Sequence, residues 1–176
     1  KLLIVTNAAG SLDENMPAGS LMAISDHINW SGYNPLIGKN QDEYGPRFHD
    51  MSDGYHKFYR DQLLEIGKKT NQQIFEGIYC MYSGPNFETP AEINALKVIG
   101  GNAVGMSTVP EVLVANHCDL PVIAISVITN LAAGMNKTKL SHKETLENAS
   151  LAEQNIVQLI KNFITEVKFN DPTGNN

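Results

Sequence analysis

Phe87 and Glu88 stand side by side in the segment SGPNFETPAE, residues 83–92, directly after an apolar stretch. An aromatic ring can stack on a flat heterocycle, and a carboxylate can accept hydrogen bonds from ring N–H groups. The pair therefore suits a base that carries donors along one edge, such as guanine or hypoxanthine. The alternative is structural, because a carboxylate just before a helix also complements the helix dipole.

Asn130 is the second polar candidate, and it ends the apolar stretch LPVIAISVITN. Its amide carries both a donor and an acceptor, so it can face a ring nitrogen and a neighbouring carbonyl together. The competing interpretation is a turn-forming residue after a strand.

Two further segments could hold an anion. TNAAG, residues 6–10, offers small side chains and backbone N–H groups, although tight packing of a turn explains it equally well. Ser107 precedes Pro110 at an expected helix start, where it is either an N-cap or a phosphate ligand, and the isolated motif favours the cap. His142 lies at another expected helix start, where a solvated first-turn role is the common one.

The composition narrows the classes of function. Apolar residues make up 42% and charged residues 18% of the 176 residues, with a net charge of -6 and no basic run. This argues against nucleic acid or an anionic membrane as the main partner. The five histidines have no metal-ligand spacing, and no Walker or Gly-x-Gly-x-x-Gly motif occurs, so we expect no metal and no cofactor.

The cysteines indicate the cellular compartment, and the first residues indicate whether the chain is part of a longer protein. We expect Cys80 and Cys118 to be buried thiols, and no apolar run is long enough for a bilayer, so the prediction is cytoplasmic. The chain begins at Lys1, inside what looks like a buried strand. We therefore expect it to be the later part of a longer protein.

Hydrophobic periodicity and turn residues predict the elements that must position these side chains. Strands are expected at 2–10, 19–29, 74–84, 102–107 and 120–130, helices at 55–71, 89–101, 108–119 and 144–167, and a long ordered loop at 31–54. Thr89, Pro90 and Glu92 predict the start of the helix at 89–101, and Asp53 is a possible cap of the helix at 55–71. Alternating strands and helices predict one α/β domain, residues 1–176, with an open mixed central β-sheet flanked by helices. Ligands in such folds bind at the carboxyl ends of strands, so we expect the four polar segments to converge there.

The motifs VTNAAG, DHIN, NPLIG, GPNFETPAE, GMSTVPEV and TNLAAG occur in an order and spacing that resembles the trimeric, low-molecular-mass purine nucleoside phosphorylases. The resemblance covers nearly the whole chain, whereas the N-terminal third of that family has no counterpart in it. It implies phosphorolysis of 6-oxopurine nucleosides, with inorganic phosphate as co-substrate, no cofactor and a homotrimeric assembly.

The resemblance also implies roles for individual residues. Ala8, through its N–H, and Ser107 are similar to phosphate ligands, Glu88 to the carboxylate that accepts the base N1–H, and Asn130 to the residue that binds O6 and N7. His142 resembles the histidine at the ribose 5′-hydroxyl, and Phe48 an aromatic that reaches the neighbouring subunit's site. The remaining predicted substrate-binding residues are Phe87, Val104, Gly105, Met106, Tyr79 and Thr129.

Two other interpretations stay open from the sequence. Methylthioadenosine phosphorylases share the scaffold, but they have Asp and Ser where this chain has Asn130 and Glu88, so the resemblance favours 6-oxopurines. The family's other phosphate ligands belong to the third without a counterpart. The chain could therefore be a non-catalytic fragment that binds purine or assembles with a partner.

Overall fold

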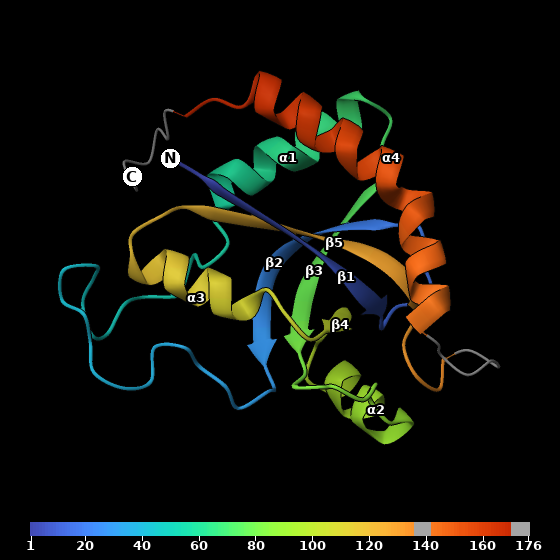
Figure 1. Ribbon diagram of the computed structural model, residues 1–176. Helices are drawn as coiled ribbons and strands as arrows, with labels where there is room; N and C mark the ends of the chain where they lie inside the picture. Colours follow the sequence, from blue (N-terminus) through green and yellow to red (C-terminus); the bar gives the residue numbers. More distant parts are fainter. Residues whose placement is uncertain (136–141, 170–176) are drawn as a thin grey trace.

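The computed structural model describes residues 1–135 and 142–169, without the side chains of residues 142–151 (Figure 1). Each expected strand and helix has a counterpart. The strands are β1 (Leu3–Ser11), β2 (Leu21–Asn29), β3 (Ile74–Met81), β4 (Ala103–Gly105) and β5 (Val122–Leu131). The helices are α1 (Lys57–Lys69), α2 (Pro90–Val98), α3 (Val109–His117) and α4 (His142–Glu166). No helix in the described part of the chain is long and apolar enough to cross a bilayer.

The sheet is mixed, as predicted, but it is not open. β1 pairs with β5 and β3 pairs with β2 and β4 in parallel, whereas β1–β4 and β2–β5 are antiparallel. The pairing closes into a barrel in the order β1-β4-β3-β2-β5. The prediction of an open sheet was therefore wrong, because no local pattern reveals the short β2–β5 pairing that completes the ring.

Two irregularities in strand pairing accompany this closure. The β1–β5 register shifts between Ala9 and Gly10, and the β2–β3 register shifts between Ile24 and Asp26. Bulges of this kind bend a strand and increase its twist, which lets a short sheet curl on itself. β1 also continues to Ser11, so the turn expected within TNAAG is absent and those residues belong to the strand.

Helices cover the barrel on two sides. α1 and α4 lie side by side on one side, α3 lies on the other, and α2 lies near the ends of β3 and β4 (Figure 1). Along β5, Ile123 and Ile125 pack in the core shared with α1 and α4, while Ala124 and Ile128 pack in the core shared with α3. Burial on both faces explains why β5 reads as a continuous apolar run.

α2 begins with the capping box that its sequence predicts. The Thr89 side chain accepts from the Glu92 N–H at 3.2 Å, and the Glu92 carboxylate accepts from the Thr89 N–H at 2.7 Å. Pro90 occupies the first turn, where its missing N–H costs nothing. Because the capping box fixes the start of α2, it also fixes the direction from which the preceding residues Phe87 and Glu88 approach the helix.

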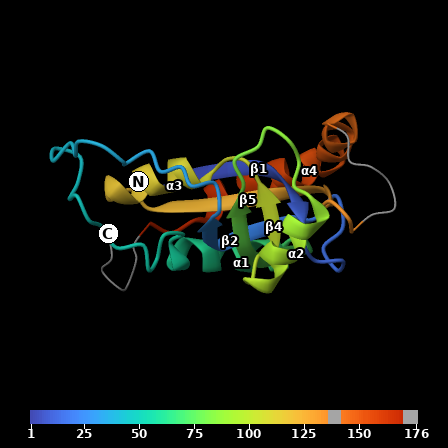
Figure 2. The same ribbon diagram turned by 90° about the horizontal axis from the view of Figure 1, so that it is seen from below.

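The loop between β2 and α1, residues 31–54, is anchored to the end of α3. Asn40 Oδ1 lies 3.1 Å from His117 Nε2, and the backbone at Gly45 packs so closely on His117 that a Cβ there would lie 1.8 Å from its carbonyl oxygen. The loop reaches out beyond the strands (Figure 2). It presents large exposed side chains, among them Tyr33, Ile37 and Phe48.

The prediction of two buried thiols holds for one of them. Cys80 on β3 is buried, whereas Cys118 is exposed. Cys118 caps the C-terminus of α3, and a residue at a helix end is not covered by the apolar face that its neighbours form.

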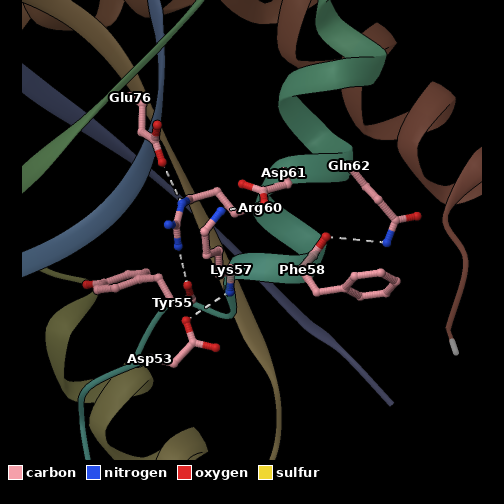
Figure 3. A network of polar contacts seen from close by, with 8 residues as sticks. All are labelled: Asp53, Tyr55, Lys57, Phe58, Arg60, Asp61, Gln62 and Glu76. Carbon is pink, nitrogen blue, oxygen red and sulfur yellow. Dashed lines mark hydrogen bonds and ion pairs between the residues drawn. The ribbon is translucent and has the colours of Figure 1, made fainter. Parts of the chain in front are cut away.

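A polar network fastens the start of α1 to β3 (Figure 3). Arg60 Nε lies 2.7 Å from Glu76 Oε1, and Arg60 Nη1 donates to the carbonyl oxygen of Tyr55. Asp53, expected as a possible cap, accepts the Lys57 N–H at 2.9 Å, although His56 holds the N-cap position. The guanidinium therefore joins a strand, a loop end and a helix.

We expect Arg60→Met to lower the free energy of unfolding by about 1.5–3 kcal/mol, because the largely buried guanidinium has charge-assisted bonds to two segments. Lys57→Met is the matched control. Its ion pair with Asp61 is exposed on both sides, so the loss should stay below about 0.5 kcal/mol. Urea denaturation of both variants measures the difference, and equal effects would contradict a structural role for Arg60.

Candidate active site

A cleft with a volume of about 320 Å³ opens where β1, β4, β5 and the segment after β3 meet. All four segments singled out in the sequence contribute to it. Its lining consists of Asn7, Ala8, Ala9, Gly10, Phe87, Glu88, Val104, Gly105, Met106, Ser107, Thr129, Asn130 and Ala132. Small side chains and strand backbone dominate, and a few polar groups stand among them.

Closure of the barrel brings these segments together. β4 runs antiparallel to β1, with Gly10 opposite Val104 and Ser11 opposite Ala103. The chain leaving β4 therefore passes back along β1 toward Asn7. β5 runs parallel to β1 and places Asn130 beside Gly10. The convergence was expected at a shared edge of carboxyl ends, whereas it arises along the side of β1.

Asn130 is held within β5 rather than in a turn after it, which excludes the turn-forming interpretation. Its Oδ1 accepts from Thr129 Oγ1 at 2.8 Å, and its Nδ2 donates to the Leu131 carbonyl at 2.9 Å. A carboxamide has two N–H groups and two oxygen lone pairs, so one of each remains for a ligand. A Cβ at Gly10 would lie 3.2 Å from Asn130 Nδ2, so glycine there leaves room for the amide.

Glu88 is buried while its neighbour Phe87 is 39% exposed, and both side chains line the cleft. Burial raises the pKa of the Glu88 carboxyl above its ordinary value, a backbone hydrogen bond opposes this, and the charge on Glu92 adds to the increase. N–H donors from a ligand would favour the ionised form. The carboxyl is therefore destabilised as an anion until a donor reaches it.

Ser107 is not the cap of α3. The N-cap position belongs to Thr108, which makes no side-chain capping bond, so the Ser107 hydroxyl has no capping role. Thr108 has φ 79° and ψ -48°, a strained combination for a β-branched residue that costs about 1–3 kcal/mol. The turn directs Ser107 into the cleft lining.

Tyr79 lies behind the cleft rather than in its wall. It is completely buried on β3, and its Oη accepts the backbone N–H of Ser107 at 3.3 Å. A Cβ at Gly105 would lie 2.4 Å from that Oη, so only glycine leaves room for the phenol. Burial raises the pKa of Tyr79, which keeps the hydroxyl neutral. In the described structure Tyr79 therefore supports the wall of the cleft, and its contact with a substrate stays a prediction.

Most of the predicted site residues meet in this cleft, whereas Phe48 and Tyr79 are not part of its lining. Phe48 is 91% exposed in the loop of residues 31–54 and is not part of the lining. Tyr79 lies behind the wall. The side chain of His142, at the start of α4, lies outside the described residues. The predicted residues within the lining are Ala8, Phe87, Glu88, Val104, Gly105, Met106, Ser107, Thr129 and Asn130.

Asn7, which had no predicted role, lines the cleft and donates to Thr108 Oγ1 at 2.8 Å. Asn7 belongs to the TNAAG segment that was singled out, so the motif contained the signal. The sequence contained no signal for the positive φ of Thr108, because β-branched residues rarely adopt it. Within the described residues, no group of three or more His, Cys, Asp or Glu side chains is arranged to hold a metal ion.

Fold and cleft together define an α/β protein with a cleft that combines a buried carboxyl, a buried amide and part of strand β1. Residues 1–165 match the family model of the phosphorylase superfamily, and the chain belongs to that family.

Named relatives and solved structures agree with the family. The chain is 46% identical over 164 residues to purine nucleoside phosphorylase 1 of Bacillus subtilis. This match covers 93% of this chain and 60% of that relative. Solved structures of Schistosoma mansoni purine nucleoside phosphorylase with inosine and with adenosine each have a TM-score of 0.92 and 32% identity, and each covers 97% of this chain. The match takes in 62% and 63% of those two chains. The described chain thus spans about three-fifths of these relatives.

Glu88→Gln should raise the melting temperature of the ligand-free protein near neutral pH. A carboxyl whose folded pKa is raised favours folding while it is protonated, and that contribution is lost as the pH rises through the folded pKa. The advantage of glutamine should therefore disappear on acidification below pH 4.5, the ordinary value for Glu.

Thermal unfolding from about pH 8 to about pH 4 measures this difference. The exposed substitution Glu153→Gln is the control and should follow the wild type throughout. A gap between Glu88→Gln and wild type that stays constant in acid would contradict the burial argument.

Proposed function

We propose that this protein acts in the phosphorolysis of 6-oxopurine nucleosides, giving the free base and ribose or deoxyribose 1-phosphate. The observation that carries the proposal is the shared cleft of Glu88 and Asn130, with Phe87 and Ser107 in the same lining. The names of the Bacillus and Schistosoma relatives support it.

The base is recognised at its edge and its face. The Glu88 carboxylate accepts the N1–H of a 6-oxopurine, and the free N–H of Asn130 donates to N7 or O6. Phe87, partly exposed at the mouth, gives an apolar face for the ring. Because the base adds N–H donors to the backbone hydrogen bond that Glu88 already has, its binding stabilises the ionised carboxylate.

The reaction needs charge stabilisation at the base. As the C1′–N9 bond breaks, its electron pair moves to the purine, positive charge grows on the ribose, and a phosphate oxygen forms the new bond to C1′. The Asn130 amide donates more strongly as negative charge collects on N7, which lowers the transition state rather than the ground state. Loss of one such preorganised donor costs about 10²–10³ in rate.

Phosphate binds at the other end of the cleft, next to β1 and the β4–α3 turn. Residues 3–9 of β1 pair with β5 on one side only among the described strands, so backbone N–H groups near Ala8 are accessible. The Ser107 hydroxyl supplies another donor. Inorganic phosphate is then the co-substrate, no cofactor takes part, and His142 holds the ribose 5′-hydroxyl.

The protein works as a cytoplasmic homotrimer in this proposal. Phe48, almost fully exposed at the end of an anchored loop, contacts the site of a neighbouring subunit. Exposed aromatic side chains on a loop held by Asn40 and Gly45 suit such a contact, since the ordering cost is already met.

A second candidate is a purine-binding protein without catalysis. It is favoured by one observation, that the chain spans about three-fifths of its relatives. The resemblance to the family places its other phosphate ligands in the part that this chain does not match. Binding of hypoxanthine without phosphate-dependent inosine cleavage would support this candidate and contradict phosphorolysis.

Asn130→Asp should lower the ratio of kcat/KM for inosine over adenosine, because a carboxylate accepts the 6-amino group of adenine and cannot donate to O6. Release of base from each nucleoside, with and without inorganic phosphate, measures the ratio. Asn155→Asp, an exposed change of the same kind on α4, should leave the ratio unaltered. An unchanged ratio in Asn130→Asp would contradict base recognition by this amide.

Phe48→Ala and Asn130→Ala should complement each other in mixed trimers. Dissociated and reassembled mixtures contain subunits with an intact Asn130 that receive Phe48 from a neighbour, so their phosphorolysis should exceed the sum of the separate variants. The double variant Phe48→Ala/Asn130→Ala mixed with Phe48→Ala is the control, and it should show no gain because no subunit then supplies Phe48. Activity no greater than that sum would show that Phe48 does not act in trans.

A further inference from the structure

Thr108 forms the centre of a three-residue turn between β4 and α3. The N–H of Val109 donates to the Ser107 carbonyl at 2.9 Å, which closes a γ-turn of the rare kind with positive φ. Thr108 is only 1% exposed. A strained backbone at a β-branched residue persists only where the surroundings hold it, and such residues cluster at functional sites.

The turn places three side-chain groups in a chain of hydrogen bonds. Asn7 Nδ2 donates to Thr108 Oγ1 at 2.8 Å, and Thr108 Oγ1 lies 3.1 Å from Ser107 Oγ. The amide nitrogen can only donate, so it occupies a lone pair of the Thr108 oxygen and leaves the Thr108 proton to be donated. The Tyr79 hydroxyl also interacts with the Thr108 side chain, so Ser107 and Tyr79 are the two possible acceptors of that proton. A hydroxyl that accepts one hydrogen bond donates the next one more strongly.

An anion bound in the cleft would fix the donor and the acceptor in each of these hydrogen bonds. Phosphate oxygens accept hydrogen bonds, so Ser107 must turn its own proton toward the anion. Its oxygen then needs a donor, and Thr108 is 3.1 Å away in the required place. From the other side, Tyr79 Oη accepts the Ser107 N–H at 3.3 Å and holds the backbone of that residue.

Asn7 has no other evident task in the described residues. Its Nδ2–Thr108 contact is the one side-chain hydrogen bond that Asn7 makes there, and its buried Oδ1 has no partner within them. An unsatisfied buried oxygen is unfavourable for stability. An apolar residue of similar size would avoid that cost, so the amide is explained by the donation to Thr108.

We propose that Thr108 is a positioning residue for phosphate: oriented by Asn7, it donates to Ser107 and aligns the Ser107 proton with a phosphate oxygen. The inference rests on the proposed function, in which Ser107 binds phosphate. Thr108 itself touches neither the base nor the sugar in this arrangement, so its effect should be confined to phosphate.

Thr108→Val keeps the branched shape and removes the hydroxyl. It should raise KM for inorganic phosphate about tenfold, with KM for inosine changed by less than about twofold. Thr108→Ser restores the hydroxyl and should stay close to the wild type. Asn7→Leu should act in the same direction as Thr108→Val and add nothing to it in the double variant, which provides a second test if Thr108→Val folds poorly.

A double-mutant cycle with Ser107→Ala separates the possible failures. Because Thr108 acts through Ser107, Thr108→Val should have no further effect on phosphate in the Ser107→Ala background. Wild-type protein without phosphate-dependent turnover or measurable phosphate binding by calorimetry would overturn the proposed function. Normal phosphate affinity in Ser107→Ala would overturn the ligand role of Ser107. Loss in Ser107→Ala but not in Thr108→Val, or additive losses, would overturn the positioning role alone.

Discussion

Burial of polar side chains against strand backbone is the constraint on which the cleft depends. Glu88 and Asn130 are both 7% exposed, and each needs partners that the interior must supply. Asn130 has two such partners within β5, the Thr129 hydroxyl and the Leu131 carbonyl. Glycine at position 10 leaves space for its amide, and glycine at position 105 leaves space for the phenol behind the cleft. Glycines in the strands therefore leave room for the functional groups of neighbouring side chains.

Preorganisation has a cost in stability that the ligand-free protein carries. A buried carboxyl with a raised pKa and a threonine with positive φ both oppose folding. The two cores around the barrel and the capping box of α2 offset them. In the proposed function, N–H donors from a base would stabilise the buried Glu88 carboxylate, so that part of the binding free energy would offset this cost.

The elements and the identity of most cleft residues could be predicted, since both are local properties. Periodicity located each strand and helix, and Thr89, Pro90 and Glu92 predicted the start of α2. Motifs singled out Glu88, Asn130 and Ser107, which the cleft unites. Prediction failed for the exposure of Cys118 and for the closure of the sheet, which depends on pairing between distant chain segments.

The sequence by itself determined the periodicities, the caps and the chemical groups available, because these depend on residue type and on neighbours a few positions away. Only the tertiary structure decided that the sheet closes, that β4 returns along β1, and that Asn7 meets Thr108 across 101 positions of chain. Strand pairing and side-chain contact between distant segments are set by the packing of the whole barrel. No local pattern encodes which edge meets which, and the positive φ of Thr108 runs against its own local preference.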